Sequence, residues 1–141
     1  MHIYRASWVL PVTSPPIREG WVAVEGGRIA AFGGAREIPG ASGEAIRRVD
    51  LGDAVIMPAL VYAHTHLELS WLRGRCRPAS TFLGWVSGMM RERLQSADGR
   101  DDGFVRAAMA AALEEMKVSG TGLAGDISNS LAHLDVLDAS G

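Results

Sequence analysis

Two histidines separated by one residue are the strongest chemical signal in this sequence of 141 residues. His64 and His66 follow an apolar run over residues 54–63 that lacks the alternation of a half-buried strand. We therefore expect a strand buried on both faces of a parallel sheet, with the histidines at its carboxyl end. Side chains two residues apart on a strand point to the same side, so both imidazoles would face one point. Imidazole is a common ligand of zinc-like ions, and the spacing predicts half of a metal site.

A purely structural role is the alternative for this pair, in which both rings cap the strand through hydrogen bonds to loop carbonyls. Pro58 at the expected start of the strand and Glu68 shortly after the histidines favour metal ligation. For Glu68 two predictions stand side by side. In the first, Glu68 has a functional role and binds a substrate hydroxyl or forms hydrogen bonds to the metal ligands. In the second, it is a solvated loop carboxylate.

Five other residues could do chemistry, and for each a structural role is the better prediction. Arg73 could bind substrate or pair with a carboxylate, and we favour the pairing. Asp126 follows an expected strand, where an aspartate usually caps a helix or accepts from loop amides. Cys76 lies among arginines but has no second cysteine, so we expect no chemical role for it. His2 and His133 are expected to be structural or solvated.

Short strands with glycine-rich turns are predicted for the first part of the chain. Gly26 and Gly27 separate two β-type runs and predict a two-residue hairpin turn. A loop is expected over residues 36–44, where proline, glycine and serine accumulate. The expected strands cover residues 2–10, 20–25, 28–32 and 46–51.

Helices alternate with strands in the rest of the chain. Ser80 is the expected N-cap of a helix to residue 94 whose Trp85, Met89 and Met90 should face the core. A second helix should begin near residues 101–102, where carboxylates favour a helix N-terminus, and should stop at a glycine, residue 120. A short strand over 121–127 and a last helix over 130–139 should follow. This alternation is typical of parallel α/β folds.

The composition excludes several classes of protein. Apolar residues make up 48% of the chain, which is too many for a disordered protein. The net charge of −2 and the lack of a basic block indicate neither nucleic acid nor a membrane surface as partner. The single cysteine excludes an internal disulfide and fits a reducing compartment. With no signal peptide and no apolar run of about 20 residues, we expect a cytoplasmic protein.

The sequence over residues 58–70, with Leu72-Arg73-Gly74, resembles the first barrel strand of the amidohydrolase superfamily. The similarity is greatest to its aminohydrolase branch, which contains adenosylhomocysteine, guanine and aminofutalosine deaminases and the chlorohydrolases. The stretch 24–33 is similar to the small β-sandwich domain of this family, and 119–126 resembles its second barrel strand. The family usually has Gly at Ala59, Asn at Tyr62 and Thr at Gly122.

This resemblance implies an α/β chain with two parts. Residues 1–57 would form part of the β-sandwich, and residues 58–141 would form the first βαβα units of an incomplete TIM (β/α)₈ barrel. Such a barrel takes about 250 residues, so most of it would lie beyond Gly141. The rest would come from the same polypeptide or from another chain, and a homo-oligomer is left open.

The resemblance also implies a chemistry. His64 and His66 would bind one divalent metal ion, with zinc expected first and iron or manganese as alternatives. The other ligands and the acid/base are expected beyond Gly141, so the chain itself would hold no catalytic residue and would be inactive alone. The parent enzyme would use metal-activated water to deaminate a small purine-like heterocycle. Two alternatives remain: a non-catalytic binding or assembly module, and one half of a two-chain enzyme.

Overall fold

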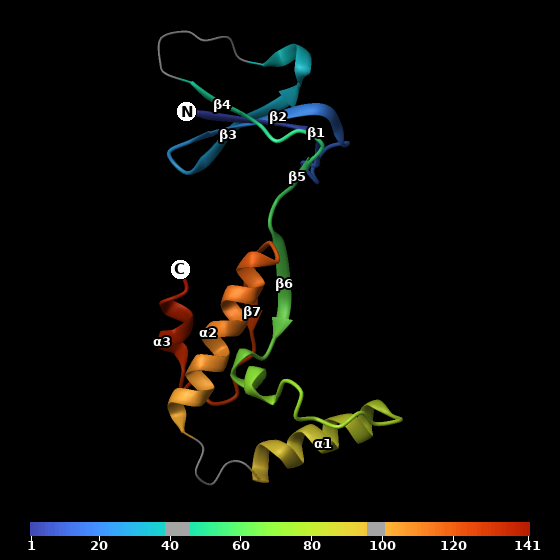
Figure 1. Ribbon diagram of the computed structural model, residues 1–141, viewed down its shortest axis with the longest axis vertical. Helices are drawn as coiled ribbons and strands as arrows, with labels where there is room; N and C mark the ends of the chain where they lie inside the picture. The colour runs from blue at the N-terminus through green and yellow to red at the C-terminus, as the bar shows by residue number, and fades with distance from the viewer. Residues whose placement is uncertain (39–45, 96–100) are drawn as a thin grey trace. The chain divides into compact units, whose positions relative to one another are not determined.

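The chain divides into two compact units, Met1–Pro58 and Ala59–Gly141, and each is described by itself (Figure 1). The computed structural model describes residues 1–38, 46–95 and 101–141. Most of the loop predicted over residues 36–44 therefore lies outside the described residues. The part inside them includes a short 3₁₀ helix, η1, at Ala35–Glu37.

The first unit is built on one sheet with β1 (His2–Val9) in its middle. On one side β1 pairs antiparallel with β2 (Ile17–Glu25), which pairs in turn with β3 (Arg28–Gly34). On the other side β1 pairs in parallel with β4 (Arg47–Asp50) and, further along, with β5 (Val55–Ile56). The predicted strands of this part of the chain are therefore confirmed, with small shifts at their ends.

The hairpin between β2 and β3 turns at the predicted glycines. Gly26 and Gly27 have φ angles of 56° and 75°, the positive values that a tight type I′ turn requires at both central residues. The core of this unit contains Ile3, Trp21 and Ala23, each at most 3% exposed. The indole N–H of Trp21 donates a hydrogen bond to a backbone carbonyl, so the ring can be buried without an unsatisfied donor.

The second unit combines a parallel strand pair with helices. Its strands β6 and β7 pair in parallel, and α2 lies alongside them (Figure 1). In chain order the elements are β6 (Leu60–Thr65), η2 (Leu67–Leu72), α1 (Phe82–Gln95), α2 (Asp102–Val118), β7 (Thr121–Asp126) and α3 (Leu134–Asp138). The alternation of helix and strand predicted for this part of the chain is present.

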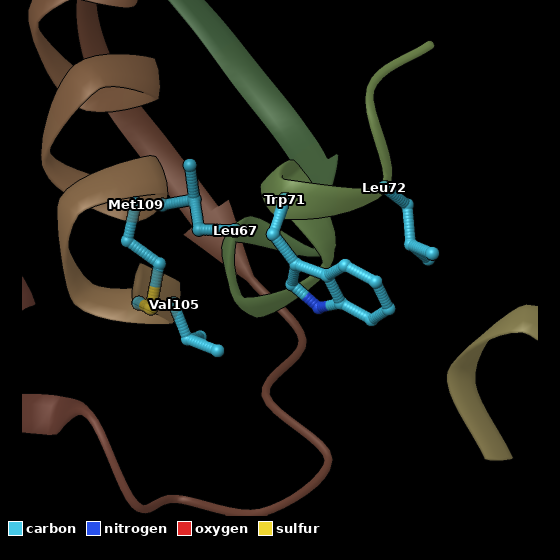
Figure 2. Packing of buried hydrophobic residues seen from close by; sticks show 5 residues of the cluster. All are labelled: Leu67, Trp71, Leu72, Val105 and Met109. Atoms are coloured by element: carbon cyan, nitrogen blue, oxygen red, sulfur yellow. The ribbon is translucent and has the colours of Figure 1, made fainter. Parts of the chain in front are cut away.

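The core of the second unit forms between η2 and α2. Leu67, Trp71 and Leu72 of η2 pack with Val105 and Met109 of α2 (Figure 2). All five are less than 9% exposed. Since η2 begins directly after His66, burial of its apolar side chains anchors the segment that follows the histidine pair.

The prediction for the apolar run over residues 54–63 holds in part. The strand expected to start at Pro58 is β6, which begins at Leu60, whereas Val55–Ile56 forms a separate strand that pairs with β1. Burial on both faces is not observed, because Leu60, Val61 and Tyr62 each expose more than half of their surface. In the described part of the chain β7 is the only strand beside β6, so one flank of β6 stays uncovered.

Three helix predictions need correction. The first helix is capped by Thr81 rather than Ser80, because the Gly84 amide donates to the Thr81 hydroxyl at 3.1 Å. Of the side chains expected in the core, Met89 packs against it, but Trp85 and Met90 are exposed because α1 packs mainly on η2. The last helix is shorter than expected: α3 begins at Leu134.

The predicted cap of the second helix is confirmed. The Asp101 carboxylate accepts from the Gly103 amide at 3.0 Å, and the chain leaves the helix through Gly120 with a φ of 87°. No helix in residues 1–38, 46–95 and 101–141 is long and apolar enough to cross a membrane.

Candidate metal centre at the end of β6

The imidazoles of His64 and His66 face each other at the carboxyl end of β6. Their Nε2 atoms lie 3.2 Å apart, and the ring planes meet at 81°. Two nitrogens that each lie about 2.0–2.1 Å from a tetrahedral zinc ion are about 3.3–3.4 Å apart. The observed spacing therefore fits two ligands of one ion.

A bulge at the end of β6 positions the first histidine. Tyr62 is paired with Ala124 and Thr65 with Asp126, so β6 has one residue more than β7 in this interval. A side chain on Gly125 would place its Cβ 2.8 Å from the carbonyl oxygen of Ala63. The close approach of the two strands here therefore requires glycine at position 125.

A hydrogen bond at the second nitrogen of His66 selects the tautomer of the neutral ring. Nδ1 lies 2.8 Å from the carbonyl oxygen of Ile127, which can only accept a hydrogen bond. Nδ1 therefore carries the proton, and in the neutral ring Nε2 is left with a lone pair. In this structure that lone pair faces Nε2 of His64. A ring with its proton on Nδ1 is the form whose Nε2 can bind a metal ion.

Further hydrogen bonds join the ends of β6 and β7. The Ile127 amide donates to the Thr65 carbonyl at 2.8 Å, and the Leu67 amide donates to Oδ1 of Asp126 at 2.7 Å. The expectation that Asp126 bonds a loop amide is confirmed. Its second oxygen, Oδ2, is buried without a hydrogen-bond partner.

Glu68 is buried, with 6% of its surface exposed, so the prediction of a solvated carboxylate is wrong. Oε1 accepts from the backbone amide and side-chain amide of Asn129 at 3.0 and 2.7 Å. Oε2 accepts from the Ser128 hydroxyl at 3.2 Å and from the amide and hydroxyl of Ser130 at 3.2 and 2.8 Å. Both oxygens are thus occupied by the segment after β7, and a contact with substrate stays a prediction.

These hydrogen bonds keep Glu68 ionised. Burial by itself raises the pKa of the carboxyl group, but the hydrogen bonds from Asn129 and Ser130 outweigh it and lower the pKa to about 2. The Arg93 guanidinium lies 3.6 Å from Oε1. At neutral pH the segment after β7 therefore surrounds a negative charge.

The other candidates have structural contacts. Arg73 pairs with Glu115 at 2.6 Å, which confirms the expected carboxylate partner, and its contact with substrate stays a prediction. Cys76 is partly buried against the core of the second unit. His2 is exposed at the start of β1. His133 is partly buried, and its Nε2 lies 2.8 Å from the Asp102 carboxylate, in agreement with a structural role.

Sequence reasoning missed the partners of Glu68. Three consecutive polar residues at 128–130 supply five donors to one carboxylate, although about 60 residues separate them from it. The polar run directly after an expected strand was the available signal. In residues 1–38, 46–95 and 101–141 no group of three or more His, Cys, Asp or Glu side chains could hold a metal ion, so the histidine pair supplies two ligands only.

Comparison with curated proteins finds deaminases and imidazolonepropionases. The chain is 38% identical over 72 residues to a 5-methylthioadenosine/S-adenosylhomocysteine deaminase of Nitratidesulfovibrio vulgaris (strain Hildenborough), covering 51% of this chain and 16% of that protein. It is 38% identical over 95 residues to an imidazolonepropionase of Paraburkholderia phymatum, covering 67% of this chain and 22% of that protein. The chain thus spans about a sixth to a fifth of the length of these relatives. No family model matches.

Solved structures share the fold. The chain matches Helicobacter pylori aminofutalosine deaminase with a TM-score of 0.72 at 23% identity, over 99% of this chain and 33% of that one. An adenosine deaminase from Xanthomonas campestris with bound zinc gives 0.74 at 24%, over 99% and 30%. A mutant of atrazine chlorohydrolase TrzN from Arthrobacter aurescens, in complex with zinc and atraton, gives 0.77 at 18%, over 99% and 33%. The chain is therefore a mixed α/β protein that matches about a third of each structure.

Proposed function

Because this chain is related to the deaminase and chlorohydrolase branch of the amidohydrolase superfamily, matching an N-terminal part of such proteins, we propose that it belongs to a metal-dependent hydrolase. The bond attacked is a carbon–nitrogen bond other than a peptide bond. The proposed reaction is the hydrolytic deamination of a purine-like heterocycle, as the names of the deaminase relatives suggest.

The two units have different roles in this proposal. Met1–Pro58 is part of a small β-sandwich, and Ala59–Gly141 forms the first βαβα units of a (β/α)₈ barrel. The parallel pairing of β6 with β7 across the intervening helices supports this assignment. The remaining strands, metal ligands and acid/base come from beyond Gly141 or from another chain.

His64 and His66 would hold the metal ion through their Nε2 atoms. When bound, a zinc ion lowers the pKa of a water molecule toward about 7, which makes hydroxide available at neutral pH. The chain contributes by orienting the ligands: the bulge in β6 places His64, and the Ile127 carbonyl keeps the proton of His66 on Nδ1. Carboxyl ends of barrel strands are where (β/α)₈ enzymes have their active sites, which agrees with the place of both histidines.

The distance of 3.2 Å between the two Nε2 atoms is the observation that carries this proposal. The test is the metal content of the purified gene product, measured by mass spectrometry, together with its deamination of purine nucleosides and bases. We expect His64→Ala and His66→Ala to lose the metal and the activity, while the exposed His2→Ala keeps both. Retention of metal and activity in both site variants would overturn the proposal.

A further inference from the structure

Glu68 accepts hydrogen bonds on both carboxylate oxygens from the segment after β7, and the Arg93 guanidinium of α1 lies 3.6 Å from Oε1. Five hydrogen bonds reach its two oxygens from three consecutive residues, Ser128, Asn129 and Ser130. A buried carboxylate is tolerated only when it is satisfied in this way, since an unpaired one would be strongly destabilising. The carboxylate and the segment therefore determine each other's position.

This segment begins directly after the carbonyl that orients His66. Ile127 precedes Ser128, and its carbonyl oxygen lies 2.8 Å from Nδ1 of His66. The amide of Ile127 is bound to the Thr65 carbonyl, so the residue is held on the β6 side. On its other side, the contacts of Glu68 with residues 128–130 fix the direction in which the chain continues, and with it the position of the Ile127 carbonyl.

Anchoring of η2 does not depend on Glu68. Leu67, Trp71 and Leu72 hold η2 against α2 through apolar packing. The carboxylate instead contacts residues 128–130, and this segment contributes no residue to the apolar core of the second unit. Loss of the carboxylate should therefore disturb residues 127–130 before it disturbs η2.

We propose that Glu68 is a positioning residue for His66. By holding the segment 127–130 it keeps the Ile127 carbonyl at Nδ1, so that the ring carries its proton there and presents Nε2 to the metal. The role in metal binding rests on the proposed function, whereas the tautomer of His66 can be measured without any metal.

The test is the tautomer of His66 in the gene product after removal of metal by a chelator. The protein is labelled with ¹⁵N-histidine, and His66→Ala assigns the signals. We expect the ¹⁵N shifts of His66 to show a protonated Nδ1 and an unprotonated Nε2. In Glu68→Gln one acceptor oxygen becomes an NH₂ group and faces a backbone amide of Asn129 or Ser130. We expect mixed tautomers in this variant and zinc affinity about 10- to 100-fold lower.

Two further variants keep the test decisive. Asn129→Ala removes the side-chain donor at 2.7 Å, and we expect a smaller shift in the same direction even if Glu68→Gln does not fold. Glu114→Gln removes the same charge from an exposed position on α2 and should change neither the tautomer nor the affinity. Circular dichroism reports whether each variant is folded.

The outcomes separate this inference from the proposed function. An unchanged His66 tautomer in folded Glu68→Gln and Asn129→Ala would overturn the positioning role, even if the protein binds zinc and deaminates its substrate. A changed tautomer in a protein that never binds metal would support the positioning role and count against the proposed function.

Discussion

The side chain of Ala59 fills the space that a side chain at position 122 would take. A Cβ on Gly122 would lie 2.5 Å from the Cβ of Ala59, closer than two carbon atoms can approach. The family that the sequence resembles usually has the opposite arrangement, with glycine at the first position and threonine at the second. The two departures therefore compensate each other: the extra methyl group of Ala59, just before β6, is matched by the missing side chain of Gly122 on β7.

This compensation predicts a strong coupling between the two positions. We expect Gly122→Thr alone to lower the free energy of unfolding by about 1–3 kcal/mol, because it overpacks the contact. Addition of Ala59→Gly should recover most of this loss, although Ala59→Gly alone gains nothing. Urea denaturation of the four proteins in the cycle measures the coupling. Simple addition of the two single effects would show that the residues do not compete for one space.

At the scale of the elements, the sequence was sufficient to predict features that depend on neighbouring residues only. Gly26 and Gly27 predicted the hairpin turn, and Asp101 predicted the start of α2, because each acts on residues next to it in the sequence. The spacing of His64 and His66 predicted that their rings face one point. The bulge in β6 could not be predicted, since it depends on the close approach of Gly125, some 60 residues away in sequence. For the same reason the burial of Glu68 was missed.

The bulge gives a prediction for the β6–β7 junction. Gly125→Ala should push β7 away from the Ala63 carbonyl, which would lie 2.8 Å from the new methyl group, and so displace His64. We expect zinc affinity to fall and the free energy of unfolding to drop by about 1–3 kcal/mol. Calorimetric zinc titration and urea denaturation of the gene product provide the two measurements.

Gly88→Ala is the matched control for that change. A Cβ on Gly88 of α1 meets nothing within 4 Å, so the same substitution there should raise stability by about 0.5–1 kcal/mol through helix propensity. Zinc affinity should stay as in the parent protein. Equal effects of the two substitutions would show that β6 and β7 have room to spare at their junction.

At the scale of the whole molecule, several large apolar side chains of the second unit are exposed. Val61 of β6 is 65% exposed although it lies in a strand, and Phe82 and Leu83 at the start of α1 are more than 70% exposed. Strands of parallel sheets are normally covered on both faces and flanks. The sequence pattern that predicted a buried strand therefore agrees with the proposed barrel, in which further strands and helices would cover β6.

Two valines that are both exposed in this structure distinguish a covered β6 from an uncovered one. Val61 is 65% exposed on β6, and Val118 is 88% exposed at the end of α2. If the proposed barrel surrounds β6 in the gene product, Val61→Asp places an unpaired carboxylate in its interior and should cost about 3 kcal/mol or more. Val118→Asp should change stability by less than about 0.5 kcal/mol, as surface substitutions usually do. Thermal unfolding of both variants decides the question, because similar small effects would mean that nothing covers β6.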